Sequence, residues 1–380
     1  MKDCVAILDI GSSTIVALVG EHGVNNTFKI SGKGDISYAG FQNSEFLEPE
    51  NLKFAIGNAI SNAEITSDSK ITEMYIGVPG EFCACVTKSI NLKFPKQKKV
   101  TDFDVENIFK TGDTFANDPE YKVINKSVVF YEIDNIKRVI DPVGMKVKTL
   151  TGNISYVLAM KSFLSLLKSI FADLRIHIKG FISATLAESL YLFEPKVRDR
   201  YALLVDVGYI TTTVSLARGN ALLFLNNFSL GGGYITSDLS ECLHISFSEA
   251  ERLKHKVVLG WNAKQEDTYE IDGVETIQTY SAKATNEIVS DRIEMICEYI
   301  LKCLDNCAYD LPDFLPINIT GGGFNFIKGI KPFLAKKLKR QVEIIAPNLP
   351  NVNRPDYSSE VGLLNMVLNY DYLLDEILEK

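Results

Sequence analysis

The sequence has few of the features that mark exported, membrane-spanning or nucleic-acid-binding proteins. Its first residues, MKDCVAILDIG, lack the apolar core of a signal peptide, and no run of roughly 18 apolar residues occurs. Positive charge is also scarce, because 40 Lys and Arg stand against 48 Asp and Glu, for a formal net charge of −8. Nucleic acid is therefore not an expected partner, since phosphate backbones are bound through an excess of basic side chains.

Cysteine motifs are missing as well. The seven cysteines are scattered from Cys4 to Cys307, and no Cys-x-x-Cys pair occurs. We interpret them as buried free thiols in a reducing compartment rather than as disulfides or metal ligands. What the chain does have is 46% apolar and 23% charged residues over 380 positions, which predicts a globular protein of two or three domains.

The order of local patterns predicts a module inserted into a larger domain. Residues 1–40 have strand patterns, and Pro49 opens a helical pattern. Residues 81–158 then hold alternating strands around one short helix, TDFDVENIFKTG, which is typical of a small α+β module. Helical pattern returns at residues 160–173, followed by the strand HIKGFI and a helix that ends near Phe193.

Two stretches share a strand–turn–strand pattern that suits a phosphate group. Residues 9–14 (DIGSST) and 206–211 (DVGYIT) align without gaps and share Asp, Gly and Thr. Backbone N–H groups in such a turn can bind an anion, and glycine and small hydroxyl residues allow close approach. Asp9 or Asp206 at the strand end can hold Mg2+ through its waters. The alternative is an ordinary hairpin with Asp at its turn.

Two glycine triplets follow. In INITGGGFNFIKGI, residues 317–330, a strand ends at the triplet 321–323 and leads into a helical pattern. These glycines either let a flat ligand lie on the backbone or form a loose turn. In LGGGYITSD the triplet 231–233 precedes Thr236, which we expect to be the N-cap of a helix.

A further helix is expected from about Ser248, in the segment SEAERLKHK. Its Glu251 and Lys254 are three residues apart and share a helix face. They form either a surface ion pair or a clasp for a ribose and base. The residues alone favour the ion pair.

The order of these motifs resembles that of the actin-like ATPase superfamily. Segments in and around the insert, ITEMYIGVPGEF, VTDFDVEN and IDPVGMKV, resemble the bacterial cell-division family FtsA, as do TSDLSECLHISFSEAERLK and PDYSSEVGLL. The resemblance spans about residues 4 to 365 and implies a two-lobed, actin-like α/β fold of the duplicated ribonuclease H-like kind. It also implies four subdomains: 1A (1–80 and 159–197), an SHS2-like 1C insert (81–158), 2A (198–235 and 309–380) and 2B (236–308).

The resemblance assigns a site for ATP and Mg2+. Asp9 and Asp206 would hold Mg2+ through water, and Glu251 and Lys254 would meet the ribose and adenine. The remaining nucleotide-binding positions it implies are Gly11, Ser12 and Ser13 in the first hairpin, Gly208 in the second, Gly232 and Gly233 facing the phosphates, and Gly321, Gly322 and Gly323 on the adenine side.

The second hairpin departs from the superfamily pattern. Tyr209 and Ile210 replace two glycines, and Thr213 replaces a final Asp. The preceding helix, ISATLAESL, has Ala184 where the superfamily often has an acid or amide to orient water. Glu188 lies one turn later and could replace that group only if the helix were rotated. Because phosphoryl transfer depends on positioning and charge stabilisation, we predict that ATP is held but hydrolysed slowly or not at all, and we name no catalytic residue.

The resemblance also implies partners. Subdomain 2B would bind the C-terminal peptide of FtsZ, the chain would self-associate head to tail into filaments, and 1C would meet other division proteins. FtsA ordinarily ends in a basic membrane-binding helix. Here NMVLNYDYLLDEILEK is acidic, so no direct membrane anchor is visible, and the chain is either a truncated or a diverged member. We expect a cytoplasmic protein, recruited to the inner face of the membrane at the division site.

Two other functions fit parts of the sequence. A type IV pilus assembly protein of the PilM kind shares the fold and insert without needing a lipid helix. A small-molecule kinase of the same superfamily would need a carboxylate base, and none is evident beyond the two aspartates assigned to Mg2+.

Overall fold

The computed structural model describes residues 4–23, 27–42, 45–273 and 276–370. The chain divides into two compact units. Unit 1 comprises residues 1–202, 215–226 and 359–380, and unit 2 comprises residues 203–214 and 227–358. Each unit is described by itself. Of the acidic C-terminal segment NMVLNYDYLLDEILEK, residues 371–380 lie outside the described residues.

Unit 1 begins with a five-stranded sheet of order β11-β6-β1-β2-β3. Strands β1 (Cys4–Ile10), β2 (Thr14–His22) and β3 (Phe28–Ser37) pair antiparallel, and β6 (Glu73–Val78) and β11 (His177–Ser183) add parallel strands. Helix α1 (Pro49–Ser67) starts at Pro49 as predicted. It lies against β3 at Gly34, where a Cβ would be 1.9 Å from the Ala59 carbonyl oxygen, so only glycine permits this approach.

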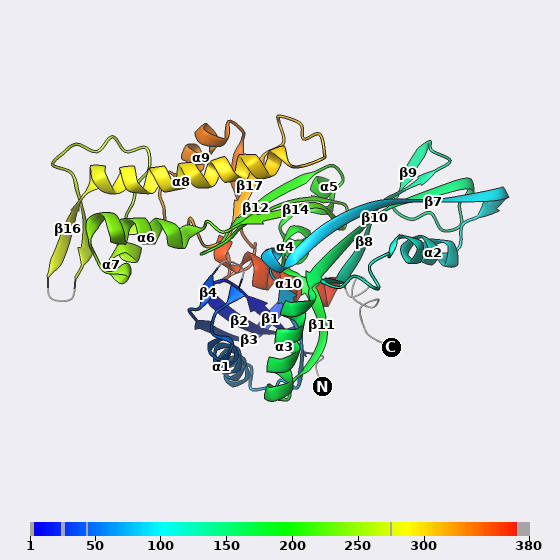
Figure 1. The fold of residues 1–380 in the computed structure, drawn as a ribbon, viewed down its shortest axis with the longest axis horizontal. Coiled ribbons are helices and arrows are strands. Elements are labelled where there is room, and N and C mark those ends of the chain that lie inside the picture. The colour runs from blue at the N-terminus through cyan, green and yellow to red at the C-terminus, as the bar shows by residue number, and fades with distance from the viewer. Residues whose placement is uncertain (1–3, 24–26, 43–44, 274–275, 371–380) are drawn as a thin grey trace. The chain divides into compact units, whose positions relative to one another are not determined.

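The insert is a separate four-stranded antiparallel sheet of order β7-β10-β8-β9, and β7 and β10 lie side by side along most of their length (Figure 1). Its elements are β7 (Cys83–Lys99), α2 (Asp102–Gly112), β8 (Tyr121–Ile133), β9 (Lys137–Val139) and β10 (Lys146–Met160). Helix α2 is the predicted short helix, and Thr101 and Asp104 cap it reciprocally. One sheet face and α2 enclose an apolar core that includes Ile108, Leu150 and Ile154.

Further elements of unit 1 lie before and after the sheet of the insert. They are α3 (Lys161–Leu174), α4 (Ala184–Leu192), α5 (Pro195–Arg198) and the C-terminal helix α10 (Ser358–Asn369), with the short segments β4 (Phe41–Gln42), β5 (Glu45–Phe46) and η1 (Gly80–Phe82). Helix α10 belongs to unit 1 from Ser359 onward and is almost entirely buried from there.

A third sheet has the order β14-β13-β12-β17-β18. Its strands are β12 (Ala202–Val207), β13 (Thr212–Arg218), β14 (Ala221–Phe228), β17 (Ile317–Thr320) and β18 (Val342–Ile344). Residues 215–226 of this sheet belong to unit 1. Unit 2 contains α6 (Gly232–Leu243), α7 (Phe247–Lys254), the hairpin β15 (Thr268–Asp272) and β16 (Ile277–Ser281), the long helix α8 (Ala282–Asp305), α9 (Ile330–Leu338) and η2 (Pro355–Tyr357). Helix α6 packs on both α7 and α8.

Three local predictions need correction. Helix α6 begins at Gly232, with Gly231 as its N-cap, so Thr236 lies inside the helix. The segment after Thr320 does not run straight into a helix, because α9 begins only at Ile330. All seven cysteines are free, but Cys4 and Cys242 are exposed, so the expected burial is wrong for these two.

Within the described ranges, none of the helices is long and apolar enough to span a membrane.

Candidate functional site

The two phosphate-type hairpins close in the same way. In the β1–β2 turn the Gly11 N–H donates to the Thr14 carbonyl oxygen over 2.9 Å. In the β12–β13 turn the Gly208 N–H donates to the Thr211 carbonyl oxygen over the same 2.9 Å. The six-residue repeat in the sequence is therefore also a repeat of turn geometry, one copy in each unit.

Asp9 is the chemically distinctive residue of the first hairpin. It is half-buried at the end of β1 and accepts a hydrogen bond from the Ser359 hydroxyl over 2.9 Å. Burial raises the pKa of Asp9 to about 6, although the Ser359 hydrogen bond and the nearby Lys33 ammonium oppose the shift. Ser12 and Ser13 lie half-buried on the turn itself.

In unit 2 the second hairpin is held by both glycine triplets. The N–H groups of Gly232 and Gly233 donate to the carbonyl oxygens of Gly208 (2.9 Å) and Tyr209 (2.7 Å). The Gly323 N–H donates to the Val207 carbonyl oxygen over 2.7 Å. These N–H groups therefore fix the turn, and both triplets lie directly against it.

The packing among these segments leaves no space for side chains. A Cβ on Gly232 would be 2.3 Å from the Gly323 carbonyl oxygen, and one on Gly323 would be 2.5 Å from the Gly208 carbonyl oxygen. Gly321 has a φ of +86°, and a Cβ there would be 2.0 Å from Oδ1 of Asp206. Gly322, by contrast, is exposed. The glycines are thus required by close backbone approach.

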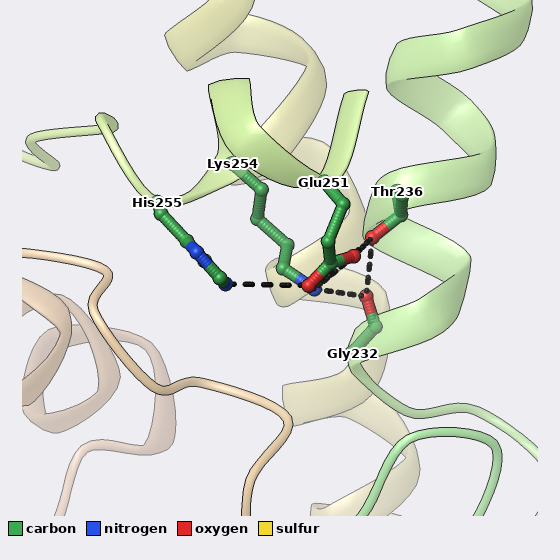
Figure 2. Close-up of polar contacts among 5 residues, drawn as sticks. All are labelled: Gly232, Thr236, Glu251, Lys254 and His255. Atoms are coloured by element: carbon green, nitrogen blue, oxygen red, sulfur yellow. Dashed lines mark hydrogen bonds and ion pairs between the residues drawn. The ribbon is translucent and has the colours of Figure 1, made fainter. Parts of the chain in front are cut away.

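Figure 2 shows a cluster of polar side chains where helices α6 and α7 meet. The Lys254 ammonium lies 2.7 Å from Glu251 Oε1, and it donates to the Thr236 hydroxyl (3.0 Å) and the Gly232 carbonyl oxygen (3.3 Å). The Thr236 hydroxyl in turn donates to Glu251 Oε2, and His255 Nε2 lies 3.2 Å from Glu251 Oε1. The predicted ion pair is confirmed, but it is not a surface pair, because only 3% of the Lys254 side chain is exposed.

The pKa values of Glu251 and Lys254 are shifted for different reasons. Burial would raise the pKa of Glu251, but the Lys254 ammonium and the hydrogen bonds from Lys254 and Thr236 outweigh it, so the pKa is lowered. Burial lowers the pKa of Lys254 despite the attraction of Glu251. Since an ammonium has only three N–H donors, and all are used within the protein, Lys254 positions Glu251. Glu251 remains 31% exposed and keeps acceptor capacity for a ligand.

Tyr209, the residue that departs from the superfamily pattern, contacts the same cluster. Its ring lies against Gly233, where a Cβ would be 2.8 Å from Tyr209 Cε1. The Lys254 ammonium lies 5.6 Å from the ring centroid, within range of a cation–π interaction. Burial and the Glu251 carboxylate raise the pKa of Tyr209 to about 12, so its hydroxyl is neutral at physiological pH.

Sequence reasoning missed two residues of the site. Thr236 was expected to cap α6, whereas it lies one turn inside the helix and bonds to Glu251 and Lys254. Its spacing of four residues from Gly232, at the start of the helix, is the available signal, because a Thr hydroxyl often bonds the carbonyl four residues earlier. Ser359 is 350 residues from Asp9 in sequence, and no local pattern relates them.

Comparison with known proteins shows which family the sequence matches. The profile of the family described as Cell division protein FtsA matches residues 203–362. The profile described as the SHS2 domain inserted in FtsA matches residues 80–158. The chain belongs to the FtsA family. Cell division protein FtsA of Neisseria meningitidis serogroup B is 24% identical, over 95% of this chain and 89% of the relative. FtsA of Streptococcus pneumoniae is 26% identical, over 94% of this chain and 78% of the relative.

Solved structures confirm the actin-like fold expected for an FtsA-type chain. The PilM–PilN type IV pilus biogenesis complex contains a chain with a TM-score of 0.63 at 13% identity, covering 99% of both chains. MreB5 of Spiroplasma citri bound to AMPPNP has a TM-score of 0.57 at 11% identity, covering 98% of both chains. At these identities the likeness concerns the fold alone.

Proposed function

We propose that this FtsA-family protein binds ATP with Mg2+ and hydrolyses it slowly or not at all. As a division scaffold it would associate with copies of itself and link the FtsZ ring to the division machinery. The arrangement around Glu251 is the observation that best supports nucleotide binding. Its carboxylate is ionised, partly exposed and fixed by Lys254 and Thr236, beside a turn that both glycine triplets hold.

Glu251 is suited to accept the hydroxyl groups of a ribose. A carboxylate offers about four acceptor sites, and hydrogen bonds from hydroxyls to a charged acceptor are among the stronger ones. Lys254 keeps that acceptor ionised and in place, so we assign it a positioning role. The exposed Gly322 and the half-buried Gly321 give the backbone surface on which the base would lie, and the buried Gly323 holds the turn beside it.

The donor chemistry fits Mg2+ with ATP. Mg2+ prefers oxygen ligands and usually retains several waters, so one or two carboxylates suffice for it. Asp9 and Asp206 are half-buried carboxylates at the ends of β1 and β12, each next to a turn that suits a phosphate. The approach of Gly321 to Asp206 leaves no space for any side chain beside that carboxylate. Mg2+ would supply the charge that neutralises the phosphate oxygens.

The described side chains support slow turnover. Ala184 is buried and carries no group that could orient water. Glu188, one turn later, is only 2% exposed, and its backbone lies against Gly362 of α10, where a Cβ would be 2.8 Å away. Since this packing fixes α4, Glu188 cannot take the role by rotation of the helix. Tyr209 adds a bulky ring where the superfamily has glycine.

For FtsZ we assign subdomain 2B, residues 236–308. Its surface exposes several apolar side chains: Phe247, Trp261, Ile277, Met295 and Tyr299. Such side chains suit a short peptide ligand that is anchored by a few apolar residues. Trp261 is the single tryptophan of the chain and is 41% exposed, so a peptide that contacts it would change its emission. We expect an FtsZ C-terminal peptide to shift Trp261 emission and a scrambled peptide to leave it unchanged.

The remaining assignments follow from family membership. Head-to-tail association would extend into filaments, and the 1C insert would meet neighbouring copies and other division proteins. We assign the protein to the cytoplasm, recruited to the membrane at the division site. Membership of the FtsA family favours this scaffold over the PilM-like and kinase alternatives.

Calorimetric titration with Mg-ATP, followed by a phosphate-release assay on the same sample, tests the proposal. We expect micromolar binding with negligible phosphate release. Substrate-dependent ADP release well above background would favour the kinase. Binding of a pilus membrane protein, with no binding of the FtsZ peptide, would favour the PilM-like alternative.

A further inference from the structure

Asp9 is held from the far end of the chain. Oδ1 of Asp9 accepts the hydroxyl hydrogen of Ser359, at the start of α10, over 2.9 Å. The next residue, Glu360, pairs with Lys33 of β3 over 2.6 Å, and only 3% of the Glu360 side chain is exposed. Two successive residues of α10 therefore bind charged side chains of the N-terminal sheet. Neither contact follows from the hairpin sequence around Asp9.

The position of Ser359 is fixed by tight packing of α10. A Cβ on Gly20 of β2 would lie 2.7 Å from Leu364, and one on Gly77 of β6 would lie 2.3 Å from Leu363. Gly362 lies equally close to the backbone of α4. Because α10 packs closely at these glycines, the helix cannot shift if the Asp9 carboxylate changes its orientation. The Ser359 hydroxyl is thus a fixed donor, and it selects one orientation of the Asp9 carboxylate.

We propose that Ser359 is a positioning residue that orients the Asp9 carboxylate for hydrated Mg2+ and thereby sets the Mg2+ requirement for nucleotide binding. The inference rests on the proposed function, in which Asp9 holds Mg2+ through water. The hydroxyl binds Oδ1, and by fixing the carboxylate it sets the direction from which the carboxylate can receive a metal-bound water. Partners that hydrogen-bond a metal-binding carboxylate control its orientation, and their loss weakens metal binding by roughly tenfold or more.

The neighbouring residue provides a matched control. The Ser358 hydroxyl lies 2.6 Å from the Thr320 hydroxyl at the end of β17, in unit 2. Ser358→Ala and Ser359→Ala remove the same group from adjacent positions of α10. Only the second removes a donor from Asp9. An effect that arises from general loosening of α10 would appear in both variants.

The test is a Mg2+ titration of ATP binding to the full chain, followed by calorimetry, for wild type, Ser359→Ala, Ser359→Thr and Ser358→Ala. We expect Ser359→Ala to raise the half-saturating Mg2+ concentration about tenfold. ATP affinity measured in EDTA should stay unchanged, since it does not depend on how Asp9 faces Mg2+. The unfolding midpoint should fall slightly and by a similar amount in Ser359→Ala and Ser358→Ala, because each variant loses one hydrogen bond. Ser359→Thr should restore the wild-type requirement, because it keeps the hydroxyl, and Ser358→Ala should leave it unaltered.

A second variant pair tests whether the effect acts through Asp9. In an Asp9→Asn background, Ser359→Ala should change the Mg2+ requirement no further. An equal Mg2+ requirement in wild type and Ser359→Ala would overturn the role of Ser359 while leaving nucleotide binding intact. An equal loss of ATP affinity with and without Mg2+ would also overturn it, because that indicates a structural role. Absence of ATP binding in wild type under all conditions would overturn the proposed function together with this inference.

Discussion

Lys254 and Glu251 form a buried ion pair in which Nζ lies 2.7 Å from Oε1 and only 3% of the lysine side chain is exposed. The two side chains have different environments. Lys254 uses its donors on Glu251, Thr236 and the Gly232 carbonyl oxygen, while Glu251 retains an exposed edge. A ligand at this site would therefore contact the carboxylate, and the lysine would act through it.

Replacement of Lys254 should cost both stability and nucleotide affinity. Lys254→Met leaves the Glu251 carboxylate without its cation and leaves the Gly232 carbonyl oxygen without this donor. We expect the free energy of unfolding to fall by about 2 kcal/mol, less than for a fully buried pair because Glu251 reaches water. Chemical denaturation of wild type and variant measures this. Lys256→Met, at an exposed position two residues away, is the control and should change little. Equal effects of the two variants would contradict the assigned role.

Lowering the pH should remove the contribution of Glu251 to the free energy of unfolding. Its folded-state pKa lies below the ordinary value of 4.5, so the carboxylate stabilises the fold at neutral pH, and this stabilisation is lost as pH falls below about 4.5. The difference in unfolding free energy between wild type and Glu251→Gln should therefore be full at pH 7 and should shrink as the pH falls from about 4.5 through the folded-state pKa. Denaturation series at several pH values test this. A difference that grows on acidification would show that Glu251 is not stabilised as an anion.

Two glycines of one triplet should differ sharply in their tolerance of alanine. Gly321 has a φ of +86°, and a Cβ there would lie 2.0 Å from Asp206 Oδ1, so Gly321→Ala must strain the backbone and displace Asp206. We expect a loss of about 2 kcal/mol in stability, with weaker Mg-ATP binding. At Gly322 the nearest atom would be Asp356 Cβ at 3.3 Å, so Gly322→Ala should cost less than about 1 kcal/mol. Thermal unfolding of both variants decides the comparison, and similar costs would refute the assigned packing.

Arg198 should be a major source of stability in unit 1. The residue is only 1% exposed. Its guanidinium donates to the carbonyl oxygens of Phe193 (3.0 Å) and Gly219, to Asn220 Oδ1 (2.7 Å) and to the Tyr370 hydroxyl (3.3 Å). Arg198→Met removes this donor from all four acceptors, and we expect a loss of about 3 kcal/mol. Tyr370→Phe removes only the longest of these bonds and should cost well under about 1 kcal/mol. Urea unfolding that ranks the two variants in the opposite order would contradict this account.

The elements with regular patterns could be predicted from the sequence, while those that depend on long-range contacts could not. Helix α1 begins at Pro49 because proline is favoured there and the apolar spacing is helical, both of which are local properties. The two hairpins could be recognised as a repeat because each turn closes through a local hydrogen bond, between residues that are three positions apart in the sequence. By contrast, α6 begins at Gly232 because its first N–H groups donate to Gly208 and Tyr209, more than twenty residues away in sequence.

The same distinction applies to the candidate site. The spacing of Glu251 and Lys254 indicated that they share a face, but it could not show that Thr236 closes the cluster or that the lysine is buried. The hydrogen bond of Ser359 to Asp9 joins opposite ends of the chain and depends on how α10 packs against β2 and β6. Such contacts follow from tertiary packing and leave no periodic signal in the sequence.

The central claim is that this FtsA-family chain holds a nucleotide through Glu251. The most direct test is calorimetric titration of Mg-ATP into wild type and Glu251→Gln, with phosphate release measured on the wild-type sample. The account predicts micromolar binding in wild type, at least about tenfold weaker binding in the variant, and negligible phosphate release. Equal affinity in the two proteins, or no binding to wild type, would contradict it.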